Sequence, residues 1–94
     1  MSDHTAASLA QLDVLIPLIK ALPPSPSTER LTEEAEALRR ACAAFHMEAI
    51  RFRIYNVDRL IKQTGEDPSL RKALEDVRHA LEAAGFHTRS HVAP

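Results

Sequence analysis

A single helical pattern running from residue 27 to residue 64 constrains the fold of this chain more than any other feature. The segment contains neither proline nor glycine, although the whole chain has 6 prolines and 2 glycines. Its apolar side chains recur at alternating spacings of four and three residues, which is typical of a helix that packs along one face. We therefore predict one long central helix over about residues 27–64. Its first seam consists of Leu31, Ala35, Leu38, Cys42, Phe45, Ala49 and Phe52.

A second line of apolar side chains starts halfway along this predicted helix. At about 100° of rotation per residue, this second seam lies beside the first in the C-terminal half. The C-terminal half therefore needs at least two packing partners, whereas the N-terminal half needs fewer. The second seam consists of Ala43, Met47, Ile50, Ile54, Val57 and Ile61.

Two shorter helices flank the predicted central helix. The first covers about residues 5–22, where Pro17 should either kink the helix or divide it, because proline has no amide hydrogen to donate. The second covers about residues 68–84, and Asp67 followed by Pro68 is a strong start signal. Gly85 should end this helix in the left-handed conformation, with the next residue folded back onto it.

The chain should fold as one all-α domain over residues 1–94, with residues 87–94 as a flexible tail. The two short helices together match the central helix in length, so we expect them to lie antiparallel to it, end to end. Such a layer is only two helices thick and leaves apolar surface uncovered. A second copy with its central helix antiparallel would cover it, giving a homodimer that resembles a four-helix bundle at each end. The rival prediction is a monomeric three-helix bundle in which the long helix breaks or overhangs. The predicted dimer interface contains Cys42, Phe45, Ala49, Ile50, Phe52 and Ile54.

Three polar side chains interrupt the apolar arc of the C-terminal half. His46 and Arg53 lie between the two seams, and Asn56 lies at the edge of the first. They could mark a groove between packed neighbours, with Asn56 fixing the register. Alternatively, they could form a small polar pocket for an anionic ligand or a partner side chain. An enclosed arginine requires a carboxylate partner. The candidate partners for Arg53 are Asp13, Glu75 and Asp76.

Composition argues against several classes of partner. A net charge of −1 does not suggest nucleic-acid binding. The most apolar run, residues 9–22, is too short to cross a bilayer and contains charged residues, so we expect no membrane association. The N-terminus lacks the features of a signal peptide, and the single cysteine excludes an intramolecular disulfide. These features predict a cytoplasmic protein.

No catalytic or cofactor motif emerges from the residues. His87 and His91 have the spacing of a metal-binding pair, but they lie beyond the predicted helix stop and lack a third ligand. We therefore predict a non-enzymatic protein without cofactor or metal, most simply a helical assembly or protein-interaction module that pairs with itself or with another protein. One alternative is a small ligand-binding bundle that uses His46, Arg53 and Asn56. Another is an accessory or regulatory subunit that docks on a larger enzyme through its first helix.

Overall fold

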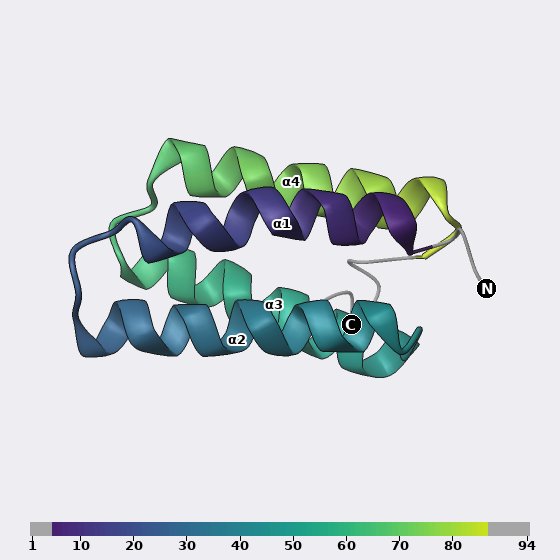
Figure 1. The fold of residues 1–94 in the computed structure, drawn as a ribbon, viewed down its shortest axis with the longest axis horizontal. Helices are drawn as coiled ribbons and strands as arrows, with labels where there is room; N and C mark the ends of the chain where they lie inside the picture. The colour runs from purple at the N-terminus through teal and green to yellow at the C-terminus, as the bar shows by residue number, and fades with distance from the viewer. Residues whose placement is uncertain (1–4, 87–94) are drawn as a thin grey trace, which may run out of the picture.

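The computed structural model of this chain describes residues 5–86, which form four helices and no strand (Figure 1). The prediction of an all-helical chain is confirmed, but the described part contains one helix more than the sequence pattern predicted. The four helices are α1 (Ala6–Lys20), α2 (Pro26–Ala43), α3 (Met47–Gln63) and α4 (Pro68–Ala83).

Helix α1 continues through Pro17 without a break. Proline removes one intrahelical hydrogen bond and costs roughly 3 kcal/mol in a helix interior. The remaining helix is nevertheless anchored, because Leu12, Leu15 and Ile19 on its inner face are fully buried. Tertiary packing therefore overrides the local preference of the proline.

Polar side chains cap the starts of α2 and α4, and the cap of α4 is the predicted one. The Ser25 hydroxyl accepts a hydrogen bond from the Thr28 amide at 3.0 Å, and a proline occupies the first turn of α2. At α4, the Asp67 carboxylate accepts a hydrogen bond from the Ser69 amide at 2.7 Å. Both side chains satisfy amides that the first helical turn leaves without partners.

The end of α4 is also as predicted. Gly85 has φ +99°, and the Phe86 amide donates to the Leu81 carbonyl at 2.9 Å. This is the hydrogen bond of a Schellman motif, in which a residue in the left-handed conformation reverses the chain. The Phe86 side chain is buried against the core.

The long central helix is the main prediction that the structure contradicts. Residues 27–64 form two helices, and the chain reverses between Ala43 and Met47. Phe45 adopts φ +59°, the His46 amide donates to the Ala41 carbonyl at 3.0 Å, and the Phe45 amide donates to the Cys42 carbonyl at 3.1 Å. These bonds form a second Schellman motif, but with phenylalanine where glycine is usual.

The reversal is favourable because it lets one chain bury the four side chains of its second seam that follow Met47. Ile50, Ile54, Val57 and Ile61 are all fully buried. Each contributes roughly 1.5–3 kcal/mol, so the four together contribute on the order of 6–12 kcal/mol. A side chain such as that of Phe45 in the left-handed conformation costs only roughly 1–2 kcal/mol. A dimer of straight helices could bury the same side chains, but only with the additional cost of association.

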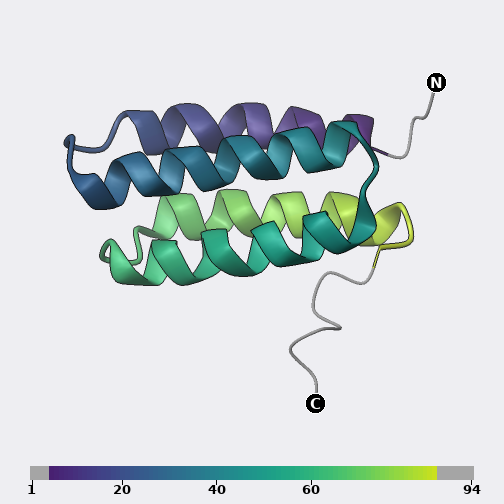
Figure 2. The same cartoon turned by 90° about the horizontal axis from the view of Figure 1, so that it is seen from below.

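Consecutive helices run antiparallel around one common core (Figures 1 and 2). Helix α1 packs against α2 and α4, and α2 packs against α3, while α3 and α4 contact each other less than these three pairs do. The two short helices were predicted to lie end to end along a central helix, and this arrangement is wrong. They lie side by side, because the turn at Phe45 divides the long segment into two antiparallel helices of similar length. The chain thereby supplies the second layer that the sequence analysis assigned to another copy.

Candidate functional site: the outer surface of α2 and α3

Two of the three predicted polar residues meet at one carboxylate between α2 and α3. The Arg53 guanidinium donates to both Glu34 carboxylate oxygens, at 3.0 and 3.1 Å. The Asn56 amide donates to one of the same oxygens at 3.3 Å. Arg53 therefore has the carboxylate partner that partial enclosure requires, but none of the predicted candidates is that partner.

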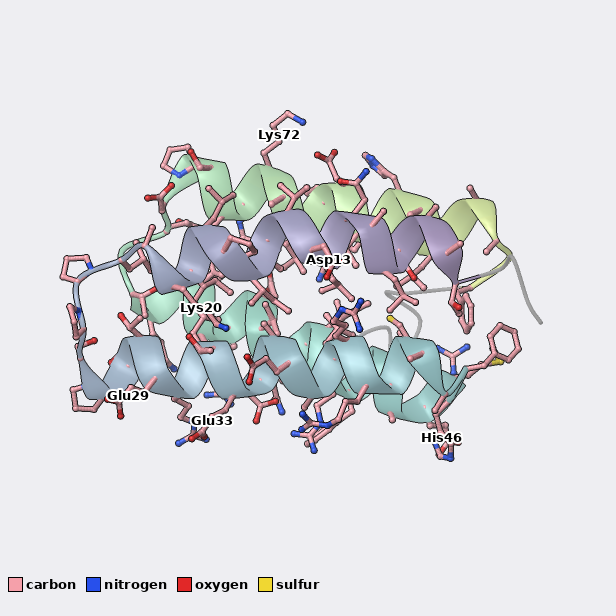
Figure 3. All side chains as sticks on the ribbon, in the orientation of Figure 1. Asp13, Lys20, Glu29, Glu33, His46 and Lys72 are labelled. Carbon is pink, nitrogen blue, oxygen red and sulfur yellow. The ribbon has the colours of Figure 1, made fainter. Side chains whose placement is uncertain are left out.

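The candidates proposed as partners of Arg53 are engaged elsewhere. Asp13 of α1 accepts a hydrogen bond from Arg39 of α2 at 2.9 Å, and this bond lowers the pKa of the Asp13 carboxyl (Figure 3). Glu75 pairs with Arg78 at 2.7 Å, and Asp76 pairs with Lys72 at 2.9 Å. Glu34 was overlooked because the predicted straight helix places residues 34 and 53 far apart, whereas the turn at Phe45 brings them together.

Arg53 also covers an exposed aromatic ring. Its guanidinium carbon lies 5.3 Å from the centroid of the Phe52 ring, which is within the range of a cation–π contact. Phe52 is 55% exposed, which is unusual for so large an apolar side chain. Since Glu34 binds the same guanidinium, Phe52, Arg53, Glu34 and Asn56 form a pre-arranged surface of mixed character.

His46 lies apart from this cluster. It occupies the position before the first residue of α3, and its exposed side chain makes no capping hydrogen bond (Figure 3). No hydrogen bond among the described residues joins His46 to Arg53 or Asn56. The three residues that the helical wheel grouped are thus divided into a pair and a separate turn residue.

Phe45, next to His46, is a second exposed aromatic residue. Its side chain is 45% exposed, and its ring meets the buried Phe86 ring edge to face, with 5.2 Å between centroids. A bulky residue with positive φ is an outlier that the surrounding structure must hold in place. The contact with Phe86 is one such restraint.

The six predicted interface residues divide into buried and exposed groups. Cys42, Ile50 and Ile54 are fully buried in the core of their own chain, and Ala49 is half-buried. These side chains could not reach a second copy without opening the fold. Phe45 and Phe52 remain accessible.

Burial also determines the chemistry of Cys42. It raises the pKa of the Cys42 thiol to about 11, although the Ser8 hydroxyl and the Arg39 guanidinium act in the opposite direction. A thiol with such a pKa is protonated at neutral pH and is a poor nucleophile.

A second ionic cluster, which the sequence analysis missed, joins α3 to α4. The Asp58 carboxylate is hydrogen-bonded to Arg71 and lies 4.0 Å from the buried Arg78, and Lys62 lies 3.7 Å away. Burial alone would raise the pKa of Asp58, but the hydrogen bond and charge of Arg71, with the charges of Arg78 and Lys62, hold it below its ordinary value. The signal was present in α4, because Arg71 and Arg78 share the spacing of the apolar residues Leu74 and Leu81.

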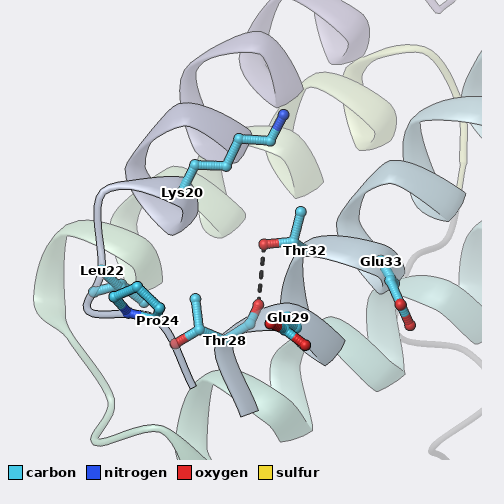
Figure 4. A pocket seen from close by; sticks show the side chains of 7 residues that line it. All are labelled: Lys20, Leu22, Pro24, Thr28, Glu29, Thr32 and Glu33. Atoms are coloured by element: carbon cyan, nitrogen blue, oxygen red, sulfur yellow. Dashed lines mark hydrogen bonds between the residues drawn. The ribbon is translucent and has the colours of Figure 1, made fainter. Parts of the chain in front are cut away.

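The described surface has a shallow hollow of about 370 Å³ at the α1–α2 connection (Figure 4). Two of its polar groups are engaged within the chain. The Thr32 hydroxyl donates to the Thr28 carbonyl at 3.0 Å, and Lys20 pairs with Glu36 at 3.3 Å. The hollow therefore does not offer a convergent set of free donors. It is lined by Lys20, Leu22, Pro24, Thr28, Glu29, Thr32 and Glu33.

Two structural features of residues 5–86 bear on other kinds of site. No helix in this range has the length and apolar character that crossing a membrane requires. Histidine, cysteine, aspartate and glutamate side chains do not gather there in any group of three or more that could hold a metal ion. The predicted pair His87 and His91 lies outside the described residues.

Comparison with known proteins adds no relative. No protein-family model, no curated protein and no solved structure matches this chain.

Proposed function

We propose that this chain is a non-enzymatic, cytoplasmic protein-interaction module that works through the outer surface of α3 and the turn before it. The observation that carries the proposal is the exposure of two phenylalanine side chains, Phe45 at 45% and Phe52 at 55%. Exposed aromatic residues next to an arginine have the composition of the energetically dominant part of protein interfaces.

The surroundings of Phe52 support this proposal. Arg53 is held over the ring, and Glu34 accepts two hydrogen bonds from Arg53. A side chain that is already ordered loses less conformational entropy when a partner binds. The cluster is therefore suited to present a fixed aromatic and cationic surface.

A homodimer remains the assembly that we propose, but on a new basis. The original reason was that one chain could not cover its own apolar surface, and the intramolecular four-helix arrangement removes it. The new reason is the aromatic surface that is left outside the core. A dimer formed there would keep each core intact and bring the Phe52 clusters of two chains together.

Solution mass tests the proposal directly. Light scattering after size exclusion should show self-association of the wild type between micromolar and millimolar concentration, and Phe52→Ala should weaken it. Val14→Ala is the matched control, because Val14 is 52% exposed but lies on α1. An unchanged association of Phe52→Ala, with helical content preserved by circular dichroism, would contradict the assignment of the surface.

The ligand-binding alternative receives less support. An anion could reach the Arg53 guanidinium only in competition with Glu34, which already accepts two hydrogen bonds from it. His46 lies apart from Arg53 and Asn56, so the three side chains do not converge on one ligand in the arrangement described above.

One observation favours the accessory-subunit alternative. The outward face of α1 is exposed and carries no charge over its whole length, which is unusual for a solvated helix face. If the wild type is a monomer at every concentration, docking of α1 on another protein becomes the better proposal. A photoreactive residue at Val14 should then cross-link to one discrete protein, whereas the same residue at Lys72 on α4 should not. The face consists of Ala7, Ala10, Val14, Pro17, Leu18 and Ala21.

A further inference from the structure

The outer side of α3 carries four residues in a regular line. Glu48, Phe52, Tyr55 and Arg59 follow one another at spacings of four, three and four, so they share one helix face. This outer stripe lies opposite the buried side chains of the second seam. Glu48 is exposed, Phe52 and Tyr55 are 55% and 44% exposed, and Arg59 is half-buried.

The outer stripe is symmetric in position and opposite in charge at its two ends. Glu48 precedes Phe52 by four residues, and Arg59 follows Tyr55 by four residues. The midpoint between the two aromatic residues is therefore also the midpoint between the two charges. At about 1.5 Å per residue, the charges lie roughly 16 Å apart along the helix axis.

Neither charge is neutralised within the described part of the chain. The ion pairs of residues 5–86 include neither Glu48 nor Arg59. By contrast, Lys62 of α3 pairs with Asp58, and Arg53 pairs with Glu34. Two opposite charges are thus available at the two ends of an exposed aromatic pair.

We propose that a second copy of this chain binds the outer stripe, with the two α3 helices antiparallel about a two-fold axis between Phe52 and Tyr55. The inference rests on the proposed function and names its partner and register. In this arrangement Phe52 of each chain meets Tyr55 of the other, and Glu48 meets Arg59 twice. An isologous contact of this kind closes on itself and does not extend into a filament.

The charges select this arrangement against the alternatives. A parallel pairing would place Glu48 on Glu48 and Arg59 on Arg59, and like charges in contact disfavour association. A shift of one helical turn along the stripe would pair an aromatic ring with a charged group. The aromatic contacts supply the attraction, and the ion pairs at the rim set the register, which is the usual division between these two kinds of contact.

Charge reversal tests the register without removing the aromatic residues. Glu48→Arg and Arg59→Glu should each weaken self-association about tenfold or more, because each converts two attractive pairs into two repulsive ones. The double variant should recover wild-type association. An equimolar mixture of the two single variants should also recover it, as a heterodimer with both ion pairs restored. Glu33→Arg is the matched control, because Glu33 is exposed on α2 and forms none of the ion pairs among the described residues.

The outcomes separate the register from the proposed function. Sedimentation equilibrium of each variant, of the double variant and of the mixture measures the dissociation constants, and circular dichroism verifies that each chain is folded. Recovery in the mixture supports the antiparallel contact, because residues 48 and 59 of one helix are too far apart to pair with each other. If Phe52→Ala weakens association but the mixture does not recover, the register is wrong and the interaction surface stands. A wild type that stays monomeric overturns the choice of a second copy.

Discussion

Replacing Phe45 separates a helix that turns at this residue from a helix that continues through it. In the turn, Phe45 has φ +59° and its ring contacts that of Phe86. Phe45→Ala removes the ring but keeps the strained backbone, whereas Phe45→Gly removes both. The difference in unfolding free energy between the two variants therefore reports the backbone conformation alone.

The expected magnitudes follow from the contacts of Phe45. Loss of the edge-to-face contact costs about 0.5–1.5 kcal/mol. Burial of about half of the phenylalanine side chain contributes about 1 kcal/mol more, so Phe45→Ala should lower the free energy of unfolding by roughly 1.5–2.5 kcal/mol. Glycine relieves the left-handed strain, and we expect Phe45→Gly to be about 1 kcal/mol more stable than Phe45→Ala. Within a continuous helix the order is reversed, with glycine about 1 kcal/mol less stable than alanine.

Urea unfolding followed by circular dichroism measures the difference, at a protein concentration low enough to exclude self-association. Ala43→Gly is the control, because Ala43 is the last residue of α2 and is exposed. There, glycine should destabilise the chain by roughly 0.5–1 kcal/mol. A Phe45→Gly variant that is less stable than Phe45→Ala would refute the turn and restore the continuous helix.

Three further predictions concern other parts of the fold. Asp58→Asn should lower the free energy of unfolding by about 1–3 kcal/mol at neutral pH, since it breaks a half-buried ion pair. The folded pKa of Asp58 lies below the unfolded value, so its contribution to the free energy of unfolding is present above about pH 4 and is lost as the pH falls through the folded pKa. The unfolding curves of the wild type and of Asp58→Asn should therefore converge in acid. Curves that stay equally far apart would contradict the role of the charge. Cys42 should react with Ellman's reagent only after unfolding, whereas a cysteine placed at the exposed Ala43 should react at once; rapid labelling of native wild type would contradict the burial of Cys42. Gly85→Ala should lower the melting temperature by about 4–8 °C, because alanine at this positive φ loses roughly 1 kcal/mol of stability. A steric clash does not contribute, since the added methyl group meets no atom within 4 Å. An unchanged melting temperature would contradict the left-handed helix end.

The sequence predicted those elements whose signals are local. Asp67 and Gly85 mark helix ends through their own backbone preferences and hydrogen bonds, and the structure has a helix end at each of them. The helical character of all four segments was likewise visible in the spacing of apolar residues. Each of these signals acts within a few residues, so it can be recognised without knowledge of the rest of the fold.

The turn at Phe45 could not be predicted because it has no local signal. Alanines, which favour helix, precede Phe45, and no glycine or proline interrupts the pattern. The turn forms because residues far apart gain from it, above all the four buried side chains of the second seam. The polar site also depends on contacts between residues that are far apart in the sequence. Arg53 and Asn56 were recognised, together with His46, as polar residues within the apolar arc of one helix, but Glu34 becomes a neighbour of Arg53 and Asn56 only after the chain has reversed.

The reversal also explains why α3 has more apolar surface than its own core uses. Up to Cys42 the first seam faces the core, and beyond the turn the second seam takes its place, with Ile50, Ile54, Val57 and Ile61 fully buried. In the continuation of the first seam, Ala49 packs partly against the core, whereas the aromatic members Phe45 and Phe52 are exposed at the turn and on α3. A helix that needed only intramolecular packing would have no requirement for aromatic residues at these positions. We therefore infer that the two seams serve two contacts, the second seam within the chain and the remainder of the first with a partner.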